Sequence, residues 1–236
     1  MPVVLPAELV ARVREAAAAM PGATAAFDAD GTLWREDIGE AFLKHLVAIG
    51  WVHMSDGSDP YHRYEERCAL DRATGFAFAA QLQEGLSRAA LEEEGARLAA
   101  QFVPTRLIDS SQALVALCRA VGLAPVIVSA SPIEIVRAAA PLAGFSVAQC
   151  LGMTVREDQT GRLTAELDGP ITYATGKVET LARRGLVPIA LACGDSHTGD
   201  LAMLSSARVA VCVAPPGGSA LAAESAARGW TILPDR

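Results

Sequence analysis

The sequence lacks any pair of cysteines with the spacing of a metal site or a disulfide framework. Its five cysteines are an odd number and are scattered along the 236 residues without a C-x-x-C motif: Cys68, Cys118, Cys150, Cys193 and Cys212. Structural zinc sites and small disulfide-bonded folds depend on closely spaced cysteines. This absence argues against both classes and favours reduced thiols, as expected in an intracellular protein.

Basic stretches and long apolar runs are also missing. The chain carries 20 Lys and Arg against 27 Asp and Glu, which gives a net charge of −7. Because nucleic-acid binding needs concentrated positive charge, we expect no nucleic-acid partner. No apolar run reaches the roughly 18 residues of a membrane span, and the N-terminus does not resemble a signal peptide. We therefore expect a cytoplasmic protein without a membrane partner; these features do not predict its oligomeric state.

Strand-like and helix-like segments alternate over much of the chain. Helical segments are predicted at 7–20, 110–121, 177–184 and 219–227, and strands at 23–27, 124–129, 186–193, 209–213 and 230–233. The run 153–167, broken at 159–161, predicts a hairpin or two short edge strands. Strands that alternate with helices indicate an α/β fold with a Rossmann-like, mostly parallel sheet.

The segment from Leu33 to about Thr105 has a different character. It lacks Val- and Ile-rich strand runs, and helical spacing recurs in 38–46, 76–83 and 91–102. We interpret it as a helical insertion. The predicted domains are therefore an α/β core (1–32 and 106–236) and a helical cap (33–105).

Two carboxylates stand at the end of the first predicted strand, in the run Phe27-Asp28-Ala29-Asp30-Gly31-Thr32. An extended backbone places Asp28 and Asp30 on one face. Like charges held this close repel one another and shift each other's pKa, so folding alone gives no reason for them. A divalent cation or a proton-transfer task does give one.

Other polar residues follow further predicted strands, where α/β sheets place their ligand sites. Ser129 closes one strand and leads into Ser131-Pro132-Ile133-Glu134, which predicts a helix capped by Ser131. Asp195 and Asp200 follow another strand. Lys177 stands at a predicted helix start, where a cation is unfavourable without an anionic partner. Taken singly, Ser129 also fits an ordinary turn, Asp200 a helix cap and Lys177 a solvated surface.

Two rival motifs fit less well. Gly194-x-Ser196 followed by Gly199 is one residue longer than a serine-hydrolase elbow. The run that starts at Asp28 lacks the later ligands of an EF-hand, because its twelfth residue is Gly39.

Taken together, the polar residues at the predicted strand ends and helix start resemble the four motifs of the haloacid dehalogenase-like (HAD) phosphohydrolase superfamily. Within that superfamily they resemble the phosphoserine phosphatase branch. The matching residues are D-x-D-G-T at 28–32, Ser129, Lys177, and the Gly-Asp pair before Asp200. The resemblance implies that Asp28 is a nucleophile that forms an aspartyl-phosphate, and that Asp30 is a general acid and base. An insertion after the first motif is similar to the C1-type cap of that family.

The resemblance also implies a magnesium cofactor. Mg²⁺ would bind the Asp28 carboxylate, the Asp30 main-chain carbonyl and Asp195, with Asp200 orienting these ligands from outside. Ser129, Ala130 and Lys177 would hold the phosphoryl oxygens. The expected substrate is a small phosphorylated metabolite.

Substrate-reading residues are expected just after the first motif. Glu36 and Asp37 are candidate acids, and Trp34 is a candidate aromatic contact. Arg63, Arg67 and Arg72 are available in the cap, but none stands in the family's R-x-x-L-L-like run. The resemblance makes phosphoserine one expected substrate, and the missing run argues against it. The aromatics Trp34, Trp51, Tyr61 and Tyr64 favour a cationic group such as choline, or else they pack the cap helices.

Two functions other than hydrolysis stay open at this stage. A phosphotransferase would use the same motifs, and a non-catalytic phosphate-binding module would use the same fold. Asp30 argues for a phosphomonoesterase or a phosphomutase over a dehalogenase, because the dehalogenases of the family lack this second aspartate.

Overall fold

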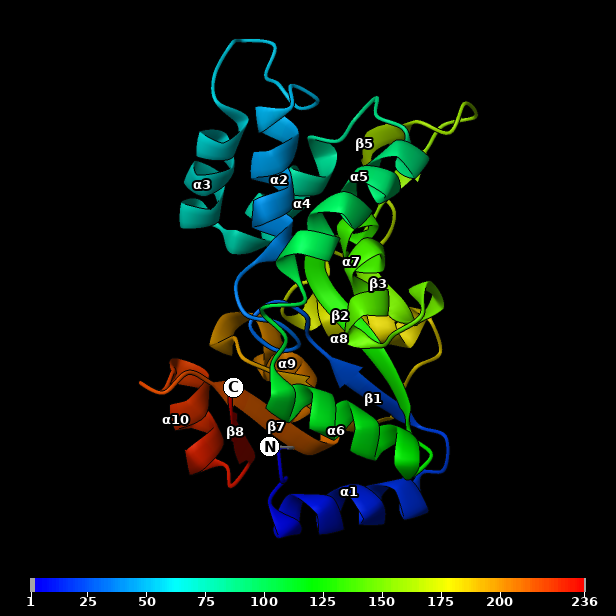
Figure 1. The fold of residues 1–236 in the computed structure, drawn as a ribbon, viewed down its shortest axis with the longest axis vertical. Coiled ribbons are helices and arrows are strands. Elements are labelled where there is room, and N and C mark those ends of the chain that lie inside the picture. The colour runs from blue at the N-terminus through cyan, green and yellow to red at the C-terminus, as the bar shows by residue number, and fades with distance from the viewer. Residues whose placement is uncertain (1–2, 236) are drawn as a thin grey trace.

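A six-stranded parallel sheet lies at the centre of the fold, with the strand order β3-β2-β1-β6-β7-β8 (Figure 1). It is seen in a computed structural model that describes residues 3–235. The strands are β1 (Thr24–Phe27), β2 (Ala124–Pro132), β3 (Cys150–Met153), β6 (Ile189–Gly194), β7 (Ala207–Ala214) and β8 (Thr231–Pro234). This arrangement confirms the predicted α/β class and parallel sheet. The four-residue strand β3 was not anticipated as part of that sheet.

Helices cover both faces of the sheet. Alternate side chains of β1 enter two separate apolar layers: Ala25 and Phe27 lie in one and Ala26 in the other. The first layer includes α1 (Ala7–Ala19) and α6 (Asp109–Ala120); the second includes α8 (Thr175–Arg183), α9 (His197–Ser205) and α10 (Ala220–Ala227). Burial on both faces explains why the strands read as continuous apolar runs.

The strand register brings three strand ends together. Phe27 on β1 lies opposite Ile127 on β2 and Cys193 on β6. The main chain continues this pairing for one residue, because the Asp28 amide donates to the Cys193 carbonyl oxygen at 2.9 Å. The residues that follow β1, β2 and β6 therefore meet at one edge of the sheet.

The segment between β1 and α6 is helical, as its sequence pattern predicted. It contains α2 (Ile38–Ala48), α3 (Pro60–Leu70), α4 (Arg72–Gln81) and α5 (Arg88–Phe102). Helix α3 was missed because it is largely polar: only Pro60 and Tyr64 are buried in it. The division of the chain into domains at residues 33 and 105 stays a prediction.

A two-stranded hairpin, β4 (Val155–Glu157) and β5 (Leu163–Leu167), packs against these helices. The Gln81 side-chain amide donates to the Ala165 carbonyl at 2.9 Å, and the Gly85 amide donates to the Leu163 carbonyl at 2.8 Å. The hairpin itself confirms the sequence reading. Its packing against the helical segment was not anticipated, because all residues after 106 were assigned to the α/β core.

Arg88, at the start of α5, joins three parts of the chain. It forms an ion pair with Glu134 on α7 (Ile133–Ala139) and another, at 2.9 Å, with Glu157 on β4. It also donates to the Val155 carbonyl at 3.0 Å. Glu134 is only 1% exposed, so this pair lies in the interior. Farther along α5, Gly95 allows close contact with α7, since a β-carbon there would lie 3.3 Å from the Ala138 β-carbon.

The turn after β2 differs from the predicted helix cap. Strand β2 runs to Pro132, where it pairs with Met153, and α7 begins at Ile133 with no side-chain cap. Ser131 therefore does not cap the helix, and Glu134 pairs with Arg88 instead of returning to a cap residue. The predicted capping box is wrong because both of its side chains have charged partners elsewhere.

Two further expectations concern covalent and membrane features. All five cysteines are free thiols, as predicted. Within residues 3–235, no helix combines the length and apolar character that crossing a bilayer requires.

Candidate active site

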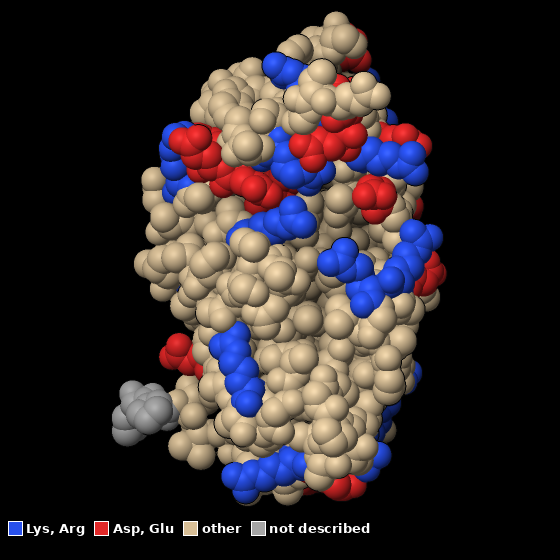
Figure 2. Space-filling view, turned by 90° about the vertical axis from the view of Figure 1, so that its right-hand side faces the viewer, with Lys and Arg blue, Asp and Glu red and all other residues tan. Residues whose placement is uncertain are grey.

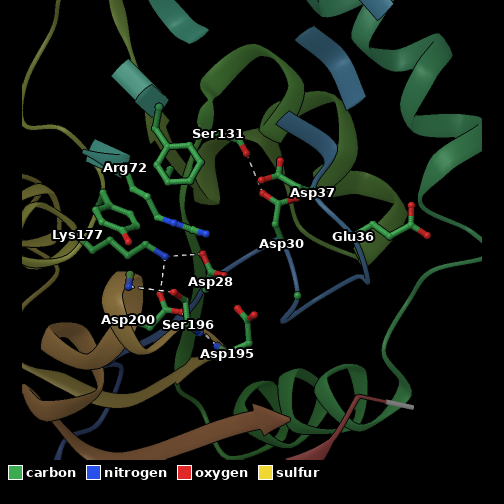
Figure 3. A pocket seen from close by; sticks show the side chains of 15 residues that line it. Asp28, Asp30, Glu36, Asp37, Arg72, Ser131, Lys177, Asp195, Ser196 and Asp200 are labelled. Atoms are coloured by element: carbon green, nitrogen blue, oxygen red, sulfur yellow. Dashed lines mark hydrogen bonds and ion pairs between the residues drawn. The ribbon is translucent and has the colours of Figure 1, made fainter. Parts of the chain in front are cut away.

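A cavity of about 410 Å³ opens at the edge of the sheet where β1, β2 and β6 end (Figure 3). Asp28, Asp30 and Asp195 line it from the strand ends, and Lys177 lines it from α8. The side chains that close its other side come from the helical segment. Residues that are far apart in the sequence are thus brought together at the place that the parallel topology dictates.

Asp28 is the first residue after β1 and is buried, with 7% of its surface exposed. The next turn depends on Gly31, whose φ is +77°. A β-carbon on Gly31 would lie 2.3 Å from the Asp195 Oδ2, so any other residue would displace that carboxylate. The Thr32 hydroxyl lies 3.4 Å from Asp28 Oδ2 and 3.2 Å from Asp195 Oδ1. Gly31 and Thr32 of the first motif thus set the distance between Asp28 and Asp195.

Asp200 organises the loop after β6. Its Oδ2 accepts the main-chain amides of Asp195 at 3.1 Å and Ser196 at 2.9 Å. Gly194 is required beside it, because a β-carbon there would lie 2.6 Å from the Asp200 side chain. The Asp200 side chain is fully buried. It therefore fixes the position from which Asp195 faces the cavity; its support of a magnesium ion stays a prediction.

Lys177 lies between two of the carboxylates (Figure 3). Its ammonium contacts Asp28 Oδ1 and Asp200 Oδ1, the latter at 2.6 Å. Burial alone would lower the pKa of Lys177, but Asp200 and Asp28 together raise it. The ammonium is therefore held in its charged form. Asp28 and Asp200 are the anionic partners that a lysine at a helix start needs.

The carboxylates of Asp28, Asp195 and Asp200 form a compact cluster. One oxygen from each lies within 4.8 Å of the others. Burial raises the pKa of Asp28 well above its ordinary value, and Asp200 adds to this effect. Burial likewise raises the pKa of Asp195 to about 7. One ammonium does not balance three carboxylates, so the donor set fits a hard divalent cation with oxygen ligands.

This cluster predicts an unusual dependence of stability on pH. Since the pKa of Asp195 is about 7 in the folded protein and about 3.9 in an unfolded chain, the folded state binds the extra proton between these values. We expect the free energy of unfolding without metal to fall as the pH rises from 5.5 to 7.5, by on the order of 1 kcal/mol per unit. Urea denaturation with a chelator present measures this.

The matched control is Asp195→Asn, which removes one titrating group and should make the slope shallower than that of wild type; the part that remains comes from Asp37, whose pKa is also raised to about 7. Magnesium should flatten it too, because a cation favours the ionised carboxylate. A wild-type slope no steeper than that of Asp195→Asn would contradict the assignment.

Asp30 accepts several hydrogen bonds. Its Oδ1 accepts from the Trp34 indole and from the Ile38 amide, both at 2.8 Å, and its Oδ2 accepts from the Ser131 hydroxyl at 2.8 Å. Burial raises the pKa of Asp30, whereas these donors lower it. The carboxylate is thus held rigidly in one orientation.

Trp34 takes a role different from the predicted substrate contact. Its side chain is fully buried, it does not line the cavity, and its indole donates to Asp30. The prediction relied on aromatic character alone, which does not reveal that the ring is needed beneath the site to orient a carboxylate.

The last residues of β2 divide between the cavity wall and its support. Ala130 and Ser131 line the cavity, whereas Ser129 is 1% exposed and does not. The Ser129 hydroxyl accepts the Ser131 amide at 3.0 Å and lies 3.4 Å from Asp30 Oδ2. Phosphate binding by Ser129 and Ala130 stays a prediction.

Glu36 and Asp37 both line the cavity, but their surroundings differ. Glu36 is 63% exposed and pairs with Arg106 at 3.0 Å. Asp37 lies beside Asp30 and caps α2 by accepting the Glu40 amide at 2.8 Å (Figure 3). Burial and the nearby Asp30 raise the pKa of Asp37 to about 7. Of the two, Asp37 is better placed to face a bound molecule.

Several cavity residues were not identified from the sequence as site residues, and three of them have large side chains: Arg72, Phe76 and Tyr173. Arg72 starts α4 and extends into the cavity, with Phe76 one turn later and Tyr173 just before α8. The rings of Phe76 and Tyr173 lie 5.3 Å apart. Three cap arginines were candidates, and only the fold shows that Arg72 is the one at the cavity. The Asp71 helix cap before it was a usable signal, since a helix start fixes where the next side chain points.

Comparisons with known proteins agree with this arrangement. A family model described as haloacid dehalogenase-like hydrolase matches residues 25–205. Protein CicA of Caulobacter vibrioides is 33% identical over 193 residues, which are 77% of this chain and 82% of CicA.

Solved structures share the fold at lower identity. A protein of unknown function from Bordetella pertussis Tohama I superposes with a TM-score of 0.73 and 19% identity, over 89% of this chain and 98% of the other. A phosphoserine phosphatase in its apo form superposes with a TM-score of 0.57 and 12% identity, over 91% and 94%. These two likenesses concern the fold alone.

Proposed function

Because the chain belongs to the haloacid dehalogenase-like hydrolase family, we propose that it hydrolyses a small phosphate monoester through an aspartyl-phosphate on Asp28. The observation that carries this proposal is the position of Asp28. Its carboxylate stands at the end of the central strand, contacts Lys177, and faces a cavity lined by Asp30 and Asp195. A nucleophile, an acid and a cation-binding cluster thus share one opening.

Asp28 is the proposed nucleophile. One of its oxygens contacts Lys177 and the other lies near the Thr32 hydroxyl, so the carboxylate is held in place. Attack by a carboxylate oxygen on phosphorus forms the acyl phosphate, while the bond to the leaving alkoxide breaks. Lys177 adds positive charge next to the transferred group, where electrostatic stabilisation is the main contribution to the rate.

Asp30 is the proposed general acid and base. In the first step its proton passes to the leaving alkoxide; in the second, its carboxylate takes a proton from the water that attacks the acyl phosphate. The raised pKa of Asp30 makes a protonated form accessible, and three donors to its carboxylate fix its direction. Hydrolysis then returns Asp28 to its free form.

A magnesium ion is the proposed cofactor. Asp28, Asp195 and the Asp30 main-chain carbonyl would hold it, and Asp200 would orient Asp195. When bound, the ion would neutralise charge on the phosphoryl oxygens. The excess of carboxylates over the single Lys177 ammonium supports this assignment.

Magnesium dependence is the direct test of the proposed function. We expect phosphate release from an aryl phosphate to require added Mg²⁺ and to fall by at least about a hundredfold with a chelator. The reason is that the ion stabilises the charge that develops in the transition state by several kcal/mol. Calcium should not substitute well, because it prefers longer bonds and higher coordination. Equal rates of phosphate release with and without chelator would refute the proposed magnesium cofactor. No phosphate release under any condition would refute the proposed hydrolase activity.

The substitution Ser131→Ala tests the hydrogen bond that the Ser131 hydroxyl donates to Asp30. A hydrogen bond to a charged group contributes about 1.5–3 kcal/mol, so kcat should fall roughly ten- to a hundredfold with little change in KM. Ser206→Ala is a suitable control, because the Ser206 hydroxyl bonds only to the Met203 carbonyl outside the cavity. A wild-type kcat in Ser131→Ala would mean that Trp34 and the Ile38 amide suffice.

The substrate is proposed to carry charge at both ends. Besides the phosphate-facing groups, the cavity offers one cation, Arg72, and two carboxylates, of which Glu36 is paired with Arg106 and Asp37 has no cationic partner among the described ion pairs. Arg72 and Asp37 suit phosphoserine, which has both a carboxylate and an amine. The Phe76 and Tyr173 rings favour phosphorylcholine as the second candidate, because its cation is bound well by aromatic faces. Initial rates with phosphoserine, phosphorylcholine and sugar phosphates distinguish these substrates.

A further inference from the structure

A second cavity, of about 260 Å³, lies between α7, the edge strand β3 and α8. None of its lining residues lines the cavity that holds Asp28. Its walls carry three arginines, Arg137 from α7 and Arg183 and Arg184 from the end of α8, against a single carboxylate, Asp168. In a chain whose net charge is −7, this local excess of positive charge is unusual.

The arginines have few anionic partners. Arg137 has only a long contact of 3.4 Å with Glu92, in which both side chains are more than one third exposed. The guanidinium of Arg183 lies near main chain, since a β-carbon on Gly169 would be 3.8 Å from its Nη1. Among the described residues, no carboxylate lies within ion-pair distance of Arg183 or Arg184. Their charge is thus available to a bound anion.

The Thr180 side chain is a further feature of this wall. Thr180 lines the same cavity, and its Oγ1 is buried without a hydrogen-bond partner in the described part of the chain. A threonine inside a helix usually bonds back to a carbonyl of the preceding turn. Helix-dipole effects account for arginines at the end of α8. They do not account for the convergence of Arg137 from another helix or for the unpaired hydroxyl.

From these contacts we infer that the cavity is a second anion site, which binds a phosphoryl group. Guanidinium groups match the oxygens of a phosphate in paired hydrogen bonds. The volume suits a phosphate with a small substituent. On the face of the molecule in Figure 2, acidic and basic side chains are mixed in the upper part, whereas Lys and Arg side chains outnumber the acidic ones across the middle.

Equilibrium dialysis with radiolabelled inorganic phosphate tests the inference. Wild type should bind one phosphate per chain more than Arg183→Gln/Arg184→Gln. The matched control is Arg208→Gln/Arg228→Gln, which removes two surface arginines outside either cavity and should bind as many as wild type. Because only the difference between variants is counted, the result does not depend on whether the Asp28 cavity binds phosphate. Equal stoichiometry in all three proteins would overturn the inference.

A second measurement avoids the variants. Crystals of the wild-type protein soaked in selenate should show an anomalous peak between Arg137 and Arg183, and a peak elsewhere only would overturn the inference. The source of the phosphoryl group is distinguished by competition with methylphosphonate. Displacement of phosphate by methylphosphonate indicates that the site accepts a phosphate ester, whereas retention indicates a site for the free ion.

Discussion

Asp28→Asn is expected to release phosphate from an aryl phosphate at least about ten thousand times more slowly than wild type. An amide does not attack phosphorus as a carboxylate does, and the substitution changes neither the size nor the shape of the side chain. Rapid acid quenching with a labelled substrate should trap a phosphorylated protein in wild type and none in the variant. These two measurements test the nucleophile directly.

The stability of Asp28→Asn separates loss of chemistry from loss of structure. Three carboxylates share one ammonium, so removing one charge relieves repulsion. The free energy of unfolding without metal should therefore stay equal or rise. Asp158→Asn is a control in an exposed turn, where activity should be unchanged. Wild-type turnover in Asp28→Asn would exclude the covalent mechanism.

Lys177→Met is expected to cost both activity and stability. The ammonium is almost fully buried between Asp28 and Asp200, so its removal leaves two buried carboxylates without a counter-charge. Breaking such a buried pair costs about 3–5 kcal/mol of folding free energy. Urea denaturation measures this loss, and kcat should fall by about a thousandfold because the cation beside the phosphoryl group is gone.

A second substitution should rescue stability without rescuing catalysis. Adding Asp200→Asn to Lys177→Met removes one of the unpaired charges and should restore part of the lost free energy, while kcat stays low. Lys44→Met is the exposed counterpart, because Lys44 pairs with Glu40 at the surface and should contribute no more than about 1 kcal/mol. Equal destabilisation by Lys44→Met and Lys177→Met would contradict the role of burial.

The sequence predicted most of the sheet and the strand-end residues because these depend on local patterns. Apolar runs revealed the central strands, and carboxylates directly after them pointed to one shared edge. Asp28, Asp30, Asp195 and Lys177 all line the same cavity. Their chemical roles stay predictions, since position alone does not show reactivity.

Features that depend on distant contacts could not be predicted. Ser131 looked like a helix cap because its neighbours fit that motif, but its hydroxyl bonds to Asp30, which is 101 residues earlier. Trp34 looked like a surface for a substrate, whereas packing places it beneath the site. The Asp71 cap marks Arg72 as the first residue of a helix, but only the direction of α4 in the fold shows that Arg72, and not Arg63 or Arg67, lines the cavity.

The Arg88 contacts limit how the chain can be engineered. Since Glu134 lies in the interior and its partner belongs to the helical segment, deleting that segment would leave this carboxylate without its counter-charge in the remaining protein. A minimal version that keeps only the sheet and its flanking helices would therefore need Glu134→Gln as a companion change. Exchange of substrate preference between relatives by grafting whole helical segments faces the same requirement: the graft must bring an arginine to this position.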